Sequence, residues 1–144
     1  MKKTFRFAAL ALAAVALTAG MSACGDDDDN NNPEDFRTID TALVGSWTYN
    51  ETDRDKTETQ TITFNADGSF AEQETEVYNN GNVVTSWDAG KWSVNARKDR
   101  VHFVVTSSSD PSDVGDEDYD NYRVSNGILY MDGNEYSLIT NPER

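Results

Sequence analysis

The chain contains one cysteine, Cys24, and one histidine, His102, the side-chain types best suited to nucleophilic and transition-metal chemistry. A thiol nucleophile needs a neighbouring base, and a structural zinc site needs about four Cys or His ligands. Neither set is present, and a lone cysteine has no partner for a disulfide within the chain. The chemistry left to Cys24 is covalent modification, and His102 is predicted to be a surface residue of a strand.

The acidic residues are the other chemical candidates, because Asp116, Asp118 and Asp120 have the i, i+2, i+4 spacing of a calcium-binding loop. In such a loop a glycine follows at the sixth position and a glutamate at the twelfth, where this chain has Asn121 and Gly127. We therefore expect a solvated acidic loop. No nucleophile motif is present either. The sequence therefore predicts that the protein is not an enzyme and that it has no catalytic residue, metal or cofactor.

The surroundings of Cys24 indicate what modifies it. Residues 1–23 begin with three basic side chains, continue with an apolar run over 7–17, and end with the small residues Ser22 and Ala23. This order is typical of a secretory signal peptide, and the apolar run is too short to span a bilayer. The alternative is an ordinary secreted protein whose cysteine lies near the cleavage site by chance.

Small residues directly before a cysteine resemble the lipobox of bacterial lipoproteins, although Met21 replaces the more usual leucine. The resemblance implies cleavage before Cys24, attachment of lipid such as palmitate to its thiol, and anchoring in the outer membrane. Two or more acyl chains hold a protein firmly, at roughly 0.8 kcal/mol per buried methylene.

Removing the leader changes the charge of the chain. The leader carries three basic residues and no acid, so nine Lys and Arg remain against 26 Asp and Glu, a formal charge of −17 over 121 residues. Binding to nucleic acid requires a basic surface, which this balance excludes. Anionic headgroups would also repel the domain, so the lipid on Cys24 must provide the membrane attachment.

Residues 24–41 are predicted to be a disordered acidic tether, because they combine Asp26, Asp27, Asp28 and Asp29 with three asparagines and a proline. A flexible arm of this length spans roughly 20–25 Å. A small residue and an acidic run after the cysteine resemble the export signal of surface lipoproteins in Bacteroidota. The resemblance implies exposure on the cell surface; the alternative is a position facing the periplasm.

At the end of the tether, Asp40-Thr41-Ala42 is similar to the three-residue O-glycosylation sequon of Bacteroidota. The resemblance makes Thr41 a candidate for modification.

Residues 42–141 show alternating apolar and polar residues between turn signals, with no period-3.6 stripe. Eight neighbour-linked strands are expected, and an up-and-down antiparallel barrel closes them with no free edge. A two-layer β-sandwich is the alternative. The acids at 72, 74 and 76 suggest an exposed edge strand, and a β-bulge is expected near Ala89-Gly90, with Trp87 and Trp92 in opposite phases on either side of it.

Three segments resemble the lipocalin-like domains of Bacteroidota lipoproteins: residues 43–47 (LVGSW), 64–70 (FNADGSF) and 90–94 (GKWSV). The resemblance covers about residues 42–140 and implies a barrel whose Gly45-x-Trp47 element packs across its closed end. It implies little about activity, because one fold supports many functions.

Five aromatic residues could either line a pocket for a small apolar ligand or fill the barrel as its core: Trp47, Phe64, Trp87, Trp92 and Phe103. The expected function is accordingly a binding or accessory module at the bacterial surface. The alternative is an interaction component that docks an envelope protein or a glycan.

Overall fold

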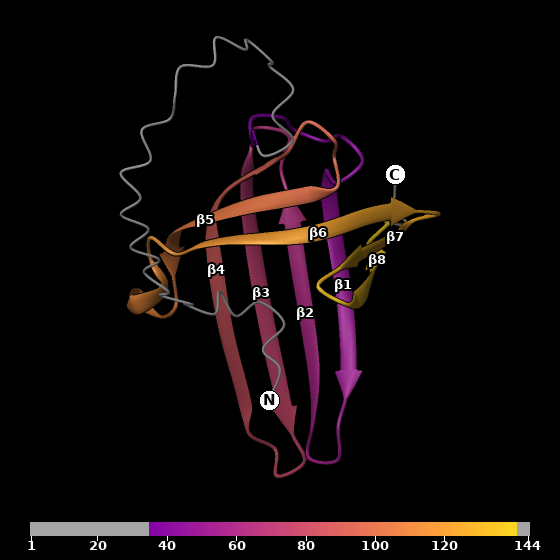
Figure 1. Cartoon of the computed structure of the whole chain (residues 1–144). Coiled ribbons are helices and arrows are strands. Elements are labelled where there is room, and N and C mark those ends of the chain that lie inside the picture. Colours follow the sequence, from indigo (N-terminus) through magenta and orange to yellow (C-terminus); the bar gives the residue numbers. More distant parts are fainter. Residues whose placement is uncertain (1–34, 141–144) are drawn as a thin grey trace, which may run out of the picture.

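The computed structural model describes residues 35–140 as one closed antiparallel barrel in which every strand pairs with its sequence neighbours and β1 pairs with β8 (Figure 1). The strands are β1 (Gly45–Thr52), β2 (Lys56–Phe64), β3 (Ser69–Tyr78), β4 (Val83–Val94), β5 (Arg100–Ser108), β6 (Glu117–Ser125), β7 (Ile128–Met131) and β8 (Asn134–Leu138), with a 3₁₀ turn at Pro111–Asp113. The predicted eight-stranded up-and-down barrel is confirmed, and the sandwich alternative is wrong.

The predictions for Cys24 and for Asp26 to Asp29 fall outside the described residues. Within the described part of the chain, no helix has the length and apolar character needed to cross a bilayer.

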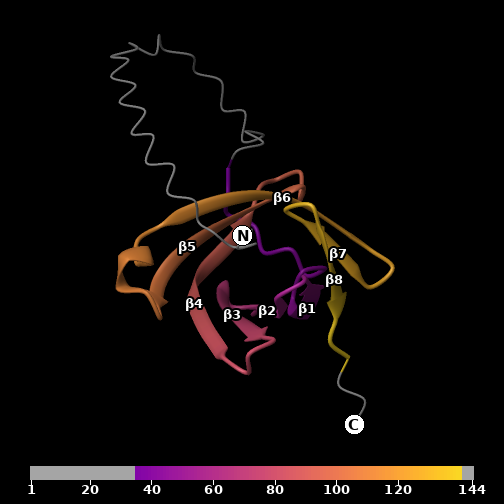
Figure 2. The same ribbon diagram turned by 90° about the horizontal axis from the view of Figure 1, so that it is seen from below.

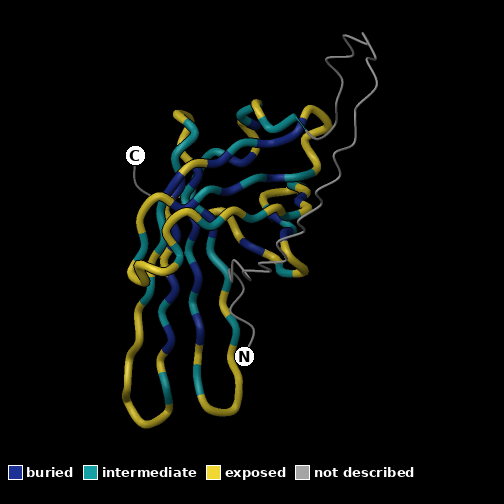
Figure 3. The backbone as a smooth tube through the Cα atoms, turned by 60° about the vertical axis from the view of Figure 1, so that its left-hand side comes forward, coloured by how far each residue is buried: buried dark blue, intermediate teal, exposed yellow. Residues whose placement is uncertain are grey.

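The barrel has two unequal parts. β1 to β4 are long and run side by side, whereas β5 and β6 lie across them at one end (Figure 1), and all eight strands form a ring when viewed along its axis (Figure 2). The β1–β2 and β3–β4 hairpins extend past the shorter strands, and their tips are exposed (Figure 3). One end of the barrel is therefore covered, and the other is bounded mainly by β1 to β4.

Gly90 marks the predicted bulge. The register between β4 and β5 shifts between Ala89 and Gly90, because Ala89 pairs with Ser107 and Gly90 with Val105, which leaves Thr106 as the extra residue. A Cβ atom on Gly90 would lie 1.8 Å from the carbonyl oxygen of Val104. Only glycine lets the two backbones approach this closely.

The bulge does not change the phase of β4, which corrects the expectation for Trp87. The extra residue belongs to β5, so β4 alternates without interruption from Asp88 through Gly90 to Trp92 along the inside of the barrel. Trp87 consequently lies on the outer face and is 45% exposed, so it belongs neither to the core nor to a lumenal pocket.

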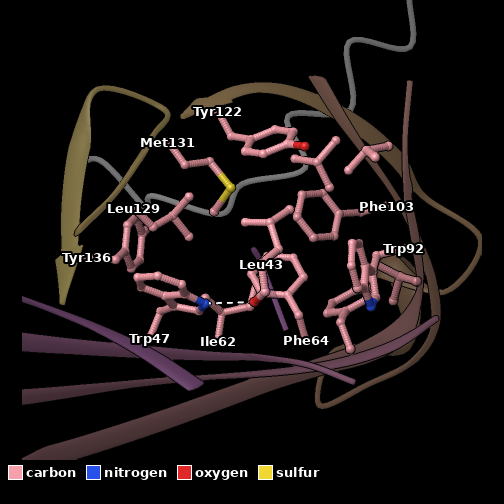
Figure 4. Close-up of a cluster of buried hydrophobic side chains, with 14 residues drawn as sticks. Leu43, Trp47, Ile62, Phe64, Trp92, Phe103, Tyr122, Leu129, Met131 and Tyr136 are labelled. Carbon is pink, nitrogen blue, oxygen red and sulfur yellow. Dashed lines mark hydrogen bonds between the residues drawn. The ribbon is translucent and has the colours of Figure 1, made fainter. Parts of the chain in front are cut away.

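The covered end of the barrel is filled by a cluster of 14 buried hydrophobic side chains (Figure 4). Trp47, Phe64, Trp92 and Phe103 all belong to it. The indole Nε1 of Trp47 donates a hydrogen bond of 2.8 Å to the carbonyl oxygen of Leu43, which satisfies its polar atom within the core. The apolar half of the lumen is therefore packed with side chains.

The segment before β1 also belongs to the folded unit. Thr38 forms a two-way backbone bridge with Val94, Ser93 Oγ donates to the carbonyl oxygen of Phe36, and the Phe36 ring lies 5.1 Å from that of Tyr119. The carboxylate of Asp40 accepts a 2.7 Å hydrogen bond from the hydroxyl of Tyr122. Residues 36–40, which the sequence assigns to the tether, are thus attached to the barrel.

Replacing Gly90 with alanine is expected to destabilise the fold by more than about 2 kcal/mol, because the added methyl group would force the backbones of β4 and β5 apart. Urea denaturation measures the change. The control is Lys91→Ala, an exposed position next to it on β4, which should change the free energy of unfolding by no more than about 0.5 kcal/mol. Equal effects of the two substitutions would contradict the close approach at Gly90.

Candidate functional site

The inward-facing side chains of β2 and β3 change from apolar to acidic along the barrel. Next to the β2–β3 turn, Phe64 faces Phe70; further along, Gln60 pairs with Glu74 and Glu58 with Glu76. All of these residues are buried. The lumen therefore has an apolar half, filled by the core, and an acidic half on the side where β1 to β4 extend.

The glutamates of β3 correct a prediction. The sequence places Glu72, Glu74 and Glu76 on an exposed edge, but they are only 5%, 7% and 6% exposed. β3 pairs with β2 on one side and β4 on the other, so it is not an edge, and the three side chains share the inner face with Phe70. The shared phase with Phe70 is the signal in the sequence that indicates their direction.

An outer cluster, defined as Lys56, Glu58, Glu74 and Glu76, lies toward the open end. The ammonium of Lys56 contacts the carboxylate of Glu76 and lies 3.3 Å from Glu58 Oε2. One oxygen from each of the three glutamates lies within 4.8 Å of the others. The hydrogen bond to Glu76 raises the pKa of Lys56 above its usual value, so Lys56 stays charged. Its positive charge offsets the repulsion among the three glutamates.

An inner cluster, defined as Glu72, Asp88 and Asp120, lies deeper. Glu72 Oε1 accepts a hydrogen bond from the side-chain amide of Gln60, and Gln60 Oε1 accepts one of 2.8 Å from the hydroxyl of Tyr136. Glu72 Oε2 is buried and has no hydrogen-bond partner. Burial raises the pKa of Glu72 well above its usual value, and the charges of Asp88, Glu74 and Asp120 raise it further.

Asp118 and Asp120 correct the expectation of a solvated loop. Both belong to β6, where they pair with Phe103 and Val101 of the core and are partly covered. Burial, followed by the charges of Asp118 and Asp132, raises the pKa of Asp120 to about 7. Burial also raises the pKa of Asp118. The spacing that resembles a calcium loop is therefore strand alternation toward the lumen.

The wall of the barrel is incomplete beside the inner cluster. β6 pairs with β7 only over Tyr122 to Ser125, and β8 pairs with β1 only at Trp47 and Thr48. A groove of about 740 Å³ lies between the first half of β6 and the β7–β8 turn, and its lining includes Asp120 and Asp132. Asp120 is the member of the inner cluster that lines this groove.

The remaining candidate residues lie elsewhere. Thr41 is exposed in the turn before β1, where a modifying enzyme could reach it. His102 lies on the outer face of β5, stacked on Tyr119 with ring centroids 4.4 Å apart, and its Nε2 is 3.3 Å from Glu117 Oε1. It is more covered than a simple surface residue, because the rings of Phe36 and Tyr119 pack against it.

Comparison with protein-family models, curated proteins and solved structures finds no match to this chain. The candidate site therefore rests on the geometry above.

The inner cluster is expected to make stability fall as the pH rises. The folded pKa of Asp120, about 7, exceeds its ordinary value of 3.8, so the stability contributed by its protonated form is complete below about pH 4 and is lost as the pH rises through about 7. Asp120→Asn should therefore unfold with a smaller pH dependence between pH 4 and 8, and should be more stable than the parent at pH 8 by about 1–3 kcal/mol.

Thermal unfolding at several pH values measures this effect. Asp53→Asn, at an exposed position of the β1–β2 turn, removes one charge away from the groove that Asp120 lines and should keep the parent's pH dependence. A parent protein whose stability rises from pH 5 to 8, with Asp120→Asn following the same slope, would contradict a raised pKa at Asp120.

Proposed function

We propose that this protein is a lipid-anchored lipoprotein of the bacterial outer membrane, exposed on the cell surface, whose barrel is a binding module for a cationic ligand. The anchoring part of the proposal is supported by the leader, the small residues before Cys24 and the acidic run after it. The binding part is supported by the acidic half of the lumen.

The observation that carries the binding proposal is the unpaired Glu72 Oε2, which is buried near further carboxyl groups, one of which, Asp120, lines the groove beside β6. Burying carboxyl groups without partners costs free energy, and proteins accept such costs mainly at functional sites. A bound cation would offset the cost by pairing with these groups. An apolar ligand is less well supported, because the apolar half of the lumen is occupied by the core.

Carboxyl groups with raised pKa values also occur in enzymes, so catalysis must be weighed against binding. Acid–base chemistry with two carboxyls requires environments that push their pKa values apart, so that one stays ionised while the other holds a proton. Here burial raises the pKa of both Glu72 and Asp120. The arrangement therefore supports binding better than hydrolysis.

Trp87 supports a second candidate function, recognition of a glycan by the outer face. A shallow groove of about 420 Å³ on β2 to β4 is lined by Trp87, Gln73 and a row of threonines, and its lining also includes Glu72 and Asp88. An exposed indole offers a face for stacking on a sugar ring, and the hydroxyls and the amide offer hydrogen bonds. Loss of glycan capture in Trp87→Ala, with the unfolding temperature unchanged, would support this function.

The binding proposal predicts that small organic cations raise the unfolding temperature of the purified lipoprotein in detergent, whereas fatty acids and retinol do not. The cation panel is spermidine, 1,4-diaminobutane and arginine methyl ester at low salt, because screening weakens charge-based binding. Stabilisation by the apolar panel alone would contradict the proposal and favour an apolar pocket.

The anchoring proposal predicts that Cys24→Ala moves the protein from the membrane fraction to the soluble fraction, because two or more acyl chains supply the attachment. Fractionation followed by immunoblotting measures the change. The matched variant, Asp26 to Asp29 all changed to Asn, should stay membrane-bound but become protected from protease added to intact cells. Tight membrane association of Cys24→Ala would contradict the lipoprotein assignment.

A further inference from the structure

Glu72 presents a single unsatisfied acceptor to the lumen. Its side chain is on the inner face because it alternates with the outward Ala71 and Gln73. The Gln60 amide, held by the Tyr136 hydroxyl, already donates to Oε1, which leaves Oε2 buried and without a partner. A group that binds the ionised form of Glu72 there must bring a hydrogen-bond donor.

The groups around Glu72 indicate that this donor is positively charged. Asp88 of β4 lies directly opposite Glu72 in the β3–β4 register. The charges of Asp88, of Glu74 on the same strand and of Asp120 on β6 add to the effect of burial in raising the pKa of Glu72. A carboxyl group that has lost its proton is an acceptor only. A cation that donates several hydrogen bonds therefore suits the inner cluster better than a neutral hydroxyl or amide.

The spacing of the carboxyl groups favours an ammonium over a metal ion. A calcium ion needs oxygens at 2.3–2.6 Å, so its ligand atoms must lie close to one another. Among residues 35–140 the trio that meets a 4.8 Å limit is Glu58, Glu74 and Glu76 of the outer cluster, and there the ammonium of Lys56 already forms ion pairs. The carboxyl oxygens of the inner cluster do not form a trio within this 4.8 Å limit. The three N–H donors of an ammonium group can reach acceptors that lie farther apart.

The groove that Asp120 lines suits a ligand with more than one positive charge. It lies between β6 and the β7–β8 turn and also carries Asp132 and Glu135. A cation at Glu72 that continued through this groove would meet these carboxyl groups with any second charge that it carried. The outer cluster shows the same chemistry within the chain, since Lys56 is itself a primary ammonium on an alkyl stem held between two glutamates.

We propose that the inner cluster of Glu72, Asp88 and Asp120 binds one ammonium group of a linear alkyl diamine or polyamine, whose remaining chain leaves through the groove between β6 and the β7–β8 turn. The inference rests on the proposed function, because it names the class of cation that the acidic lumen takes.

Binding is coupled to proton release. The groups that face Glu72 and Asp120 are Gln60 on β2, Glu74 on β3, Asp88 on β4, Asp118 on β6, Asp132 in the β7–β8 turn and Tyr136 on β8. Burial, with the charges of acidic neighbours, raises the pKa of Asp120 to about 7, so this carboxyl group holds a proton for part of the time near neutral pH, and it raises the pKa of Glu72 well above its usual value, which favours the protonated form. An ammonium that pairs with them displaces those protons, so affinity rises with pH from 6 to 8.

Calorimetric titration of the purified lipoprotein in detergent tests the inference, with spermidine, 1,4-diaminobutane, butylamine and calcium chloride as probes. We expect the diamine and spermidine to bind more tightly than butylamine. The heats should differ between buffers of different ionisation enthalpy in the sense of proton release. Glu72→Gln should weaken spermidine binding at least tenfold and reduce the released protons. Glu117→Gln removes the same charge from the outside of β6 and should change affinity less than twofold.

The outcomes separate this inference from the proposed function. Spermidine that binds the Glu72→Gln variant as tightly as the parent would overturn the inner cluster as the site, although cation binding would stand. Loss of binding in Glu58→Gln alone would assign the ligand to the outer cluster, and would also overturn the inner cluster as the site. Calcium binding that depends on Glu72 would replace the ammonium with a metal ion. Failure of all organic cations to bind would overturn the proposed function itself.

Discussion

The pairing of β1 with β8 is the contact on which the interior of this protein depends. It is short, with Trp47 opposite Leu138, Thr48 opposite Ser137, and one further backbone hydrogen bond from Ile139 to Ser46. Closure turns a row of strands into a tube, and every alternate side chain then faces a shared lumen. The glutamates of β3 are buried for that reason. The β6–β7 pairing is similarly short, covering Tyr122 to Ser125, and the groove that Asp120 lines lies beside the unpaired first half of β6.

The two halves of the lumen depend on each other energetically. A domain of about 100 residues buries only about 60–65% of its unfolded surface, and the described barrel contains no cysteine to form a disulfide. The aromatic cluster around Trp47 must therefore supply the stability that the buried carboxyl groups remove. Polar atoms inside the core are satisfied locally, as with the Trp47 indole and Leu43. The unsatisfied oxygen of Glu72 stands out against this pattern, and this contrast is the reason to assign it a ligand.

Turn chemistry and alternation were enough to predict the barrel, because hairpins such as Asn65 to Ser69 and the turns at Gly127 and Gly133 are determined locally. The face of a strand is harder to predict where both faces are polar, and β3 alternates glutamates with Ala71, Gln73 and Thr75. For β4 the sequence indicated the position of the bulge but not the strand that holds the extra residue. That choice reversed the direction of Trp87. In both cases tertiary pairing decided what local pattern left open.

The net charge of the chain and the chemistry of the lumen support the same kind of ligand. An acidic protein raises the local concentration of cations and speeds their encounter with an acidic opening, an effect that weakens as ionic strength rises. The same charge opposes contact with anionic headgroups, so in the proposed lipoprotein the long hairpins and the open end of the barrel would stay in water while the lipid holds the chain at the membrane. Selectivity must then come from the lumen, because every exposed carboxylate attracts cations, whereas among residues 35–140 the buried side-chain oxygen without a hydrogen-bond partner is Glu72 Oε2. Its desolvated setting makes a well-fitted ammonium worth more there than at the surface.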